Sequence, residues 1–157
     1  MTTFKMPPDL PLALCYDPGL ANGWAMTSLP KREWFQAGEG PIEEVADLTE
    51  GVLYALSHAS RSKTVMIIEA FTVASRPLGP SRTVTVTSES IGILKRIASK
   101  FGIKVSMRQP NERTIITAGH LRGLGWHPRG KDHATQAARH LVSWLLTEGY
   151  TRVEIPD

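Results

Sequence analysis

The stretch that decides the fold is residues 12–25, which read LALCYDPGLANGWA. Its first five residues are apolar, a pattern that predicts a short buried strand. The strand is expected to end at Asp17, because the Asp-Pro-Gly sequence that begins there is typical of a turn. An apolar pattern resumes over residues 22–28, which predicts a second strand directly after the turn.

The rest of the chain alternates between strand and helix patterns. A third strand is predicted over residues 33–37, and the break at Leu29-Pro30-Lys31 favours a hairpin before it. β-branched and apolar runs predict further strands over 64–68 and 103–107, and helical spacing predicts helices over 41–59, 88–101 and 133–147. The expected fold class is α/β, with a central mixed five-stranded sheet, three antiparallel strands and then parallel ones, flanked by helices.

Length and composition indicate a single domain over residues 1–157, with residues 1–10 as a loose N-terminal tail. Hydrophobic residues make up 41% of the chain, enough for an ordinary core. Cys15 is the sole cysteine and lies in the first apolar run, so we expect a buried structural thiol, no internal disulfide and a reducing compartment. Neither a signal peptide nor a membrane span is apparent, so a soluble, cytoplasmic protein is predicted.

The charged residues are segregated along the chain, although the net charge is only +3. Residues 33–50 contain six acids and no Lys or Arg, whereas residues 95–131 contain nine Lys or Arg and one acid, Glu112. Such segregation favours a face that meets a polyanion such as nucleic acid. A solvated basic surface without a partner remains the alternative.

Two acids end predicted strands, and a third begins the last helix. Asp17 and Glu69 each follow a buried run, and the carboxyl ends of strands line the ligand crevice of an open α/β sheet. If the two strands are neighbours, the paired carboxylates require a cation. With Asp132 they predict a two-metal phosphodiesterase site that holds Mg²⁺. Singly, the three acids also fit a turn residue, a surface acid and a helix N-cap.

Four motifs occur in the order found in a known family. They are LCYDPG (14–19) with NGWA (22–25), VMIIE (65–69), QPNER (109–113) and KDHATQAARH (131–140). Together they resemble the RuvC-type Holliday junction resolvases of the RNase H-like superfamily, and especially the shorter, phage-encoded RuvC-like relatives. The resemblance runs from about Leu12 to Leu146.

This resemblance implies an RNase H-like fold and a structure-selective endodeoxyribonuclease. The expected substrate is branched DNA, namely Holliday junctions, with forks and flaps as further candidates, cleaved in recombination, repair or replication. Two Mg²⁺ ions per active site are expected, with Mn²⁺ as a substitute, and neither a membrane nor a nucleotide cofactor is involved. Because two symmetric nicks resolve a junction, a homodimer is implied. A phage-encoded enzyme would work in the host cytoplasm.

The resemblance also implies roles for single residues. Asp17 would bridge both ions, Glu69 would hold one ion, and Arg113 would stabilise transition-state charge. The family's last helix places an acid or histidine first and an aspartate three residues later. That spacing gives His133 and Gln136 here, so the last ligand is left open among Asp132, His133 and Gln136.

Basic side chains are the expected contacts to DNA phosphates. The candidates are Arg76, Arg82, Lys104, Arg108, Arg113, Arg122, Arg129 and Lys131. Phe71 is a candidate for stacking on an unpaired base, or else a core residue, and Trp126 either touches DNA or anchors its loop. The segment between Arg113 and Lys131 looks too short for the additional helical turns expected of the bacterial enzymes.

Two other functions remain open. Gln136 in place of a carboxylate favours a catalytically weak or silent branched-DNA-binding protein. An RNase H-like nuclease that acts on another substrate, such as an RNA/DNA hybrid, is the other alternative.

Overall fold

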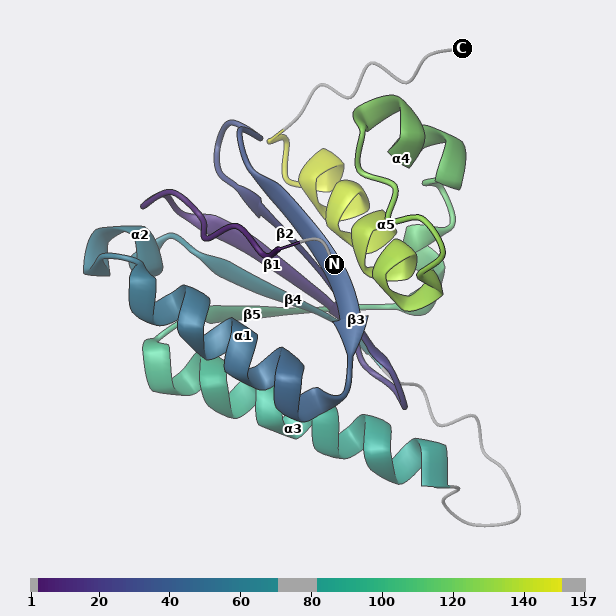
Figure 1. The fold of residues 1–157 in the computed structure, drawn as a ribbon, viewed down its shortest axis with the longest axis horizontal. Helices are drawn as coiled ribbons and strands as arrows, with labels where there is room; N and C mark the ends of the chain where they lie inside the picture. The colour runs from purple at the N-terminus through teal and green to yellow at the C-terminus, as the bar shows by residue number, and fades with distance from the viewer. Residues whose placement is uncertain (1–2, 71–81, 151–157) are drawn as a thin grey trace.

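One mixed sheet organises the chain, whose computed structural model describes residues 3–70 and 82–150 (Figure 1). Its strands are β1 (Leu12–Asp17), β2 (Asn22–Ser28), β3 (Phe35–Gly40), β4 (Val65–Glu69) and β5 (Lys104–Arg108). They lie in the order β3-β2-β1-β4-β5. β1, β2 and β3 pair antiparallel, whereas β4 pairs parallel with both β1 and β5. The predicted sheet of three antiparallel and then parallel strands is confirmed.

Helices cover both faces of the sheet. They are α1 (Ile42–Ala55), α2 (His58–Ser62), α3 (Arg82–Phe101), the 3₁₀ helix η1 (Pro110–Arg113), α4 (Ala118–Leu124) and α5 (Asp132–Thr147). Figure 1 shows α1 and α3 on one face and α5, with α4 beyond it, on the other. Among the helices within 3–70 and 82–150, none has the length and apolar character to cross a bilayer.

Three boundaries differ from those predicted. α3 begins at Arg82 rather than Ser88, because β-branched residues disfavour a helix only weakly. The helix predicted over 41–59 divides into α1 and α2, and the Ser57 side chain caps the second by accepting from Ser60 N. The segment after Arg113 does hold extra helical turns, those of α4, which Thr117 caps and Gly125 ends with a φ of 72°.

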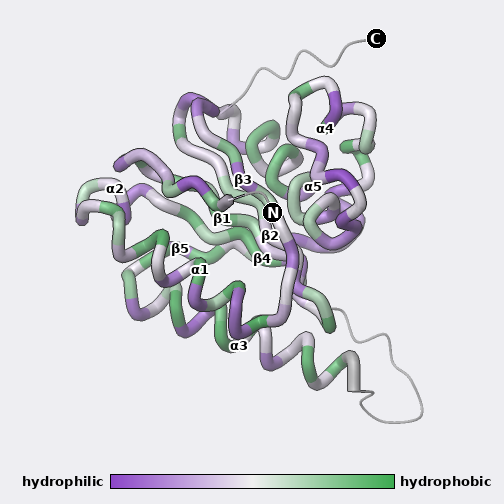
Figure 2. The backbone as a smooth tube through the Cα atoms, viewed as in Figure 1, coloured by the Kyte–Doolittle hydropathy of each residue, from purple (hydrophilic) through white to green (hydrophobic). Residues whose placement is uncertain are grey.

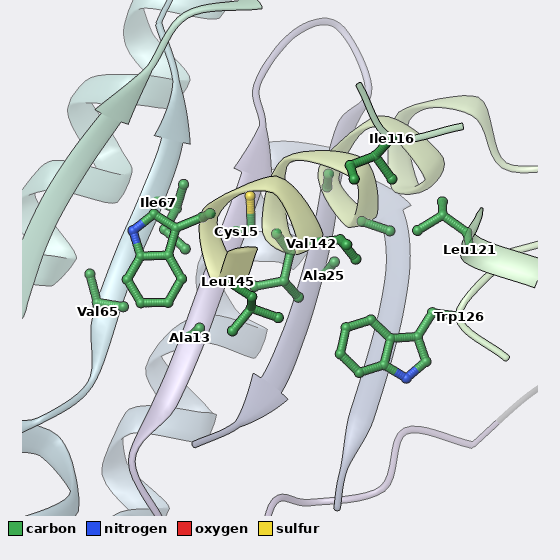
Figure 3. Close-up of a cluster of buried hydrophobic side chains, with 14 of the residues drawn as sticks. Ala13, Cys15, Ala25, Val65, Ile67, Ile116, Leu121, Trp126, Val142 and Leu145 are labelled. Carbon is green, nitrogen blue, oxygen red and sulfur yellow. The ribbon is translucent and has the colours of Figure 1, made fainter. Parts of the chain in front are cut away.

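β1 is a strand buried on both faces, which explains its unbroken apolar run. Leu12, Leu14 and Tyr16 pack towards α1 and α3, whereas Ala13 and Cys15 pack towards α5. Figure 3 shows the Cys15 sulfur beneath α5, and Figure 2 shows apolar residues concentrated in the strands and the helix faces beside them. Cys15 is therefore the buried thiol that the sequence predicts.

The N-terminal segment lies against the body of the protein. Phe4 packs edge-to-face on Trp24 and Trp34, with ring centroids 5.8 and 6.1 Å apart. Asp9 accepts a hydrogen bond from the backbone N of Ser57 at 2.9 Å. The segment from residue 3 to residue 10 has no helix or strand, as a tail would, but these contacts hold it in place.

Gly23 allows α5 to approach the sheet closely. Gly23 pairs with Asp17 across β1 and β2, and a Cβ atom on it would clash with the carbonyl group of His133. A side chain there is incompatible with this packing because the obstacle is backbone. The bare glycine thus lets the first turn of α5 rest directly on the Asp17–Gly23 pair.

We predict that Gly23→Ala displaces the start of α5 and destabilises the fold by about 1–3 kcal/mol. Gly51→Ala is the matched control, because a Cβ at Gly51 in α1 meets nothing within 4 Å. That variant should gain about 0.5–1 kcal/mol. Urea unfolding measures both, and equal stability of the two variants would contradict the close approach.

Candidate active site

Asp17 and Glu69 lie side by side at one edge of the sheet. β1 and β4 are parallel neighbours with Tyr16 opposite Ile68, so the next residue of each strand reaches the same level. The carboxyl groups of Asp17 and Glu69 are close enough to share a hydrogen bond. The two strands are therefore neighbours, which was the condition for bringing the two acids together.

The surroundings give the two carboxyl groups different protonation behaviour. Burial, followed by the charge and hydrogen bond of Glu69, raises the pKa of Asp17 to about 7, although His133 opposes the shift. Burial acts to raise the pKa of Glu69 as well, but His140 and Arg113 outweigh it and lower that pKa. In the metal-free protein Asp17 is thus the member of the pair that holds the shared proton.

Arg113, the last residue of η1, forms an ion pair with Glu69. Its Nη1 lies 2.6 Å from both Glu69 oxygens. η1 is fixed at its start by a capping box between Gln109 and Glu112, and it is tied to α5 by the Ser143 hydroxyl, which donates to the Glu112 carbonyl at 2.7 Å. The arginine that the resemblance places near the scissile phosphate is here an ion-pair partner of the acidic site.

α5 contributes two histidines, one to each acid. His133 Nδ1 lies 3.2 Å from Asp17 Oδ2, and His140 Nε2 lies 3.0 Å from Glu69 Oε2. They are seven residues apart, about two helical turns, so they share one face of α5. Gln136 lies between them and accepts a hydrogen bond from Arg139 through its side-chain oxygen at 3.0 Å.

Of the three residues considered for the last ligand, the structure brings His133 to Asp17. Asp132 is the first residue of α5 and is exposed, and the N-cap position belongs to Lys131. Within the part of the chain that the structure describes, no three His, Cys, Asp or Glu side chains gather closely enough to ligate one ion. The hard oxygens of the partly buried Asp17–Glu69 pair still have the chemistry that a divalent cation takes.

The exposed basic candidates lie in different parts of the structure. Arg129 and Lys131 line a pocket of about 460 Å³ beside β3, together with Trp24 and two acids, Glu39 and Glu44. Lys131 is exposed there, and Arg122 is exposed on α4. Lys104 pairs with Val65 at the far end of the sheet from Glu69.

Several other candidates have structural partners or lie outside the described residues. Arg108 forms an ion pair with Glu112 at 3.2 Å and has a partly buried side chain. Trp126 is buried and stacks on Phe35 at 4.4 Å, so it anchors its loop. Arg82 opens α3, and Phe71 and Arg76 lie outside the described residues.

Sequence reasoning missed His140. A buried histidine in an apolar helix stripe is usually a core residue, and only its seven-residue spacing from His133 hinted at a shared face. Its contact with Glu69 depends on the tilt of α5 over β4, which no sequence pattern encodes.

No family model matches this chain, and no curated protein matches its sequence. Solved structures with a similar fold include "T. thermophilus RuvC in complex with Holliday junction substrate", at a TM-score of 0.59 and 12% identity, covering 89% of this chain and 97% of that one. A second is "Thermus thermophilus RuvC structure", at 0.52 and 14%, covering 88% and 97%. The chain therefore has the RNase H-like fold of these RuvC structures.

We predict that Asp17→Asn stabilises the metal-free protein at alkaline pH. Because the folded pKa of Asp17 lies above its unfolded value, wild-type stability falls as pH rises from about 4 to about 7. Asparagine removes this loss, so urea unfolding in EDTA should show the variant ahead by on the order of 3 kcal/mol at pH 8 and by little near pH 4.

Asp47→Asn is the control for this measurement, because Asp47 lies in α1, away from the acidic pair. Its stability should stay within about 0.5 kcal/mol of wild type at both pH values. A stability difference between Asp17→Asn and wild type that does not change with pH would contradict the raised pKa.

Proposed function

We propose that this chain is a Mg²⁺-dependent endonuclease that cleaves branched DNA, with four-way junctions as the main substrate. The observation that carries the proposal is the partly buried Asp17–Glu69 pair at the carboxyl ends of adjacent parallel strands. A fold similar to that of a RuvC solved in complex with a Holliday junction substrate supports the choice of substrate.

The proposed ligands of the metal are Asp17 and Glu69, with His133 and Asp132 at the start of α5. A bound divalent cation would activate water and stabilise the leaving oxygen of the phosphodiester, and we keep two ions, with Mn²⁺ as a substitute, as part of the proposal. Glu69 is ready as a ligand because its lowered pKa keeps it ionised. Asp17 has to give up its proton before it can bind a cation, since its pKa is raised.

His133 and Arg113 fix the two acids. The imidazole of His133 meets Asp17, and the guanidinium of Arg113 holds both oxygens of Glu69. Arg113 is also close enough to the pair to meet negative charge on a substrate phosphate, the role that the resemblance suggests. Lys131 and Arg129, two and four residues before His133 in the chain and both exposed, are the cations proposed to hold the DNA backbone.

Further parts of the proposal come from the family resemblance alone. A homodimer would place two sites symmetrically for paired nicks. Kinship with the phage-encoded branch, and work in a host cytoplasm, belong to the same proposal.

A second candidate function is a branched-DNA-binding protein with little or no catalysis. Gln136 is hydrogen bonded to Arg139, and Asp132 is exposed at the helix start, so the third carboxylate of a typical acidic site is not joined to the pair. A third possibility is a nuclease of the same fold that acts on RNA/DNA hybrids, and its substrate preference would distinguish it from the other two.

We expect the wild-type chain to nick a synthetic four-way junction in Mg²⁺ or Mn²⁺, and Asp17→Asn to lower the single-turnover rate at least about 100-fold. Gel analysis of end-labelled junction, linear duplex and RNA/DNA hybrid measures this. Asp47→Asn should cleave like wild type, because its carboxylate lies in α1.

Each other outcome points to a different function. Junction binding without cleavage would favour the silent binding protein. Equal cleavage of linear duplex and junction would contradict selectivity for branched DNA. Preferential cleavage of the RNA/DNA hybrid would assign the chain to another class of nuclease.

The proposed DNA-backbone surface predicts a change in salt dependence. Replacing Arg129 and Lys131 with Ala should lower the slope of log K against log salt by about 0.9 for each phosphate that is no longer neutralised. Lys104→Ala is the control, because Lys104 lies at the opposite end of β5 from the acidic edge. Fluorescence anisotropy with labelled junction, in the Asp17→Asn background, measures the slopes. Equal slopes in the double variant and the control would contradict this surface.

A further inference from the structure

His140 is a fully buried histidine within the apolar stripe of α5. It is 0% exposed, and Ala137, Leu141 and Trp144 share that buried stripe. Burying an imidazole costs free energy unless its polar atoms find partners. Among the residues that the structure describes, Nε2 meets Glu69 Oε2 and Nδ1 has no partner. Packing alone would favour an apolar residue at position 140. The contact with Glu69 is therefore the interaction that a histidine adds there.

Arg113 and His140 hold Glu69 in different ways. The Arg113 Nη1 atom lies 2.6 Å from both oxygens of Glu69, so it does not distinguish one from the other. His140 meets only Oε2, at 3.0 Å. Since an ionised carboxylate only accepts hydrogen bonds, the imidazole carries its proton on Nε2 and donates it. The histidine thus breaks the symmetry of the arginine contact and fixes the rotation of the carboxylate.

We propose that His140 is a positioning residue that orients Glu69 as a ligand for the divalent cation beside Asp17. It lies one helical turn beyond Gln136, outside the positions for which the family resemblance predicts ligands. Partners of this kind hold the ligands in place in metal sites, and removing them weakens metal binding about 10–100-fold. The inference rests on the proposed metal-dependent function, but it is tested by metal affinity rather than by cleavage.

The test compares His140→Leu with His140→Gln in the full chain. Leucine keeps the apolar packing and removes the donor, whereas glutamine keeps an N–H donor on a side chain of similar reach. We expect the leucine variant to bind Mn²⁺ about 10–100-fold more weakly while its Tm in EDTA stays at or above that of wild type. The glutamine variant should recover most of the affinity. Electron paramagnetic resonance of free Mn²⁺ measures the binding, and thermal unfolding measures the Tm.

Thr64→Ala is the control. Thr64 is buried directly before β4, at the end of that strand opposite Glu69, and its hydroxyl donates to the Ser60 carbonyl at 2.9 Å. Removing that hydrogen bond should lower the Tm and leave the Mn²⁺ affinity unchanged. The leucine variant is therefore expected to lose Mn²⁺ affinity and keep its Tm, whereas the control is expected to keep its Mn²⁺ affinity and lose Tm.

Unchanged Mn²⁺ affinity in His140→Leu would overturn the proposal, as would a glutamine variant no better than leucine. If the leucine variant does not fold, His140→Asn replaces it, because its amide is one methylene shorter than that of glutamine and falls short of Glu69. Equal affinity of the asparagine and glutamine variants would then overturn the proposal. A wild-type chain that binds Mn²⁺ but cuts no DNA overturns the proposed nuclease instead, and the affinity series still decides the role of His140.

Discussion

The constraint on which the site depends is the partial burial of two carboxyl groups at the ends of adjacent parallel strands. Asp17 and Glu69 cannot both be ionised at this separation without compensation. The fold compensates unevenly, because Arg113 and His140 surround Glu69 while Asp17 has His133 alone among the ion-pair partners of the described residues. Burial, followed by the charge of Glu69, raises the pKa of Asp17, whereas His140 and Arg113 lower the pKa of Glu69 against the effect of its burial. The two acids therefore differ in pKa in the metal-free protein.

α5 is the element that makes this compensation possible. It crosses the sheet on the face opposite α1 and α3, and its first turn reaches the Asp17–Gly23 pair because Gly23 has no side chain. The positive end of its dipole lies near Asp17, where His133 makes its contact. Further along, the helix carries His140 to Glu69 and Ser143 to the carbonyl of Glu112. One glycine in β2 thereby allows α5 to bring two histidines to the acids and a serine to η1.

The sequence predicts those parts of this arrangement that depend on local pattern. The apolar run before Asp17 and the one before Glu69 mark buried strands, and their order predicts the mixed sheet and the shared edge. Arg113 could be named only through a family resemblance, and its partner Glu69 is 44 residues away. The contact of His140 and the exposed position of Asp132 could not be predicted, because both depend on the rotation of α5 about its axis. The sequence shows that an aspartate begins a helix or that a histidine lies in its apolar stripe, but it does not show which residues these side chains contact.

The asymmetry of the pair assigns different tasks to its two members. Glu69 is held in its orientation by Arg113 and His140, so the proposed cation would find there a ligand whose ordering costs little further entropy. Asp17 would have to release a proton first, and its raised pKa would tie the proposed metal binding to pH through that one group. Two ionised acids alone would repel each other in every state without metal. Because Arg113 and His140 both contact Glu69, that acid is stabilised as a carboxylate while Asp17 stays protonated more easily, and the unequal partners thus relieve the repulsion within the pair.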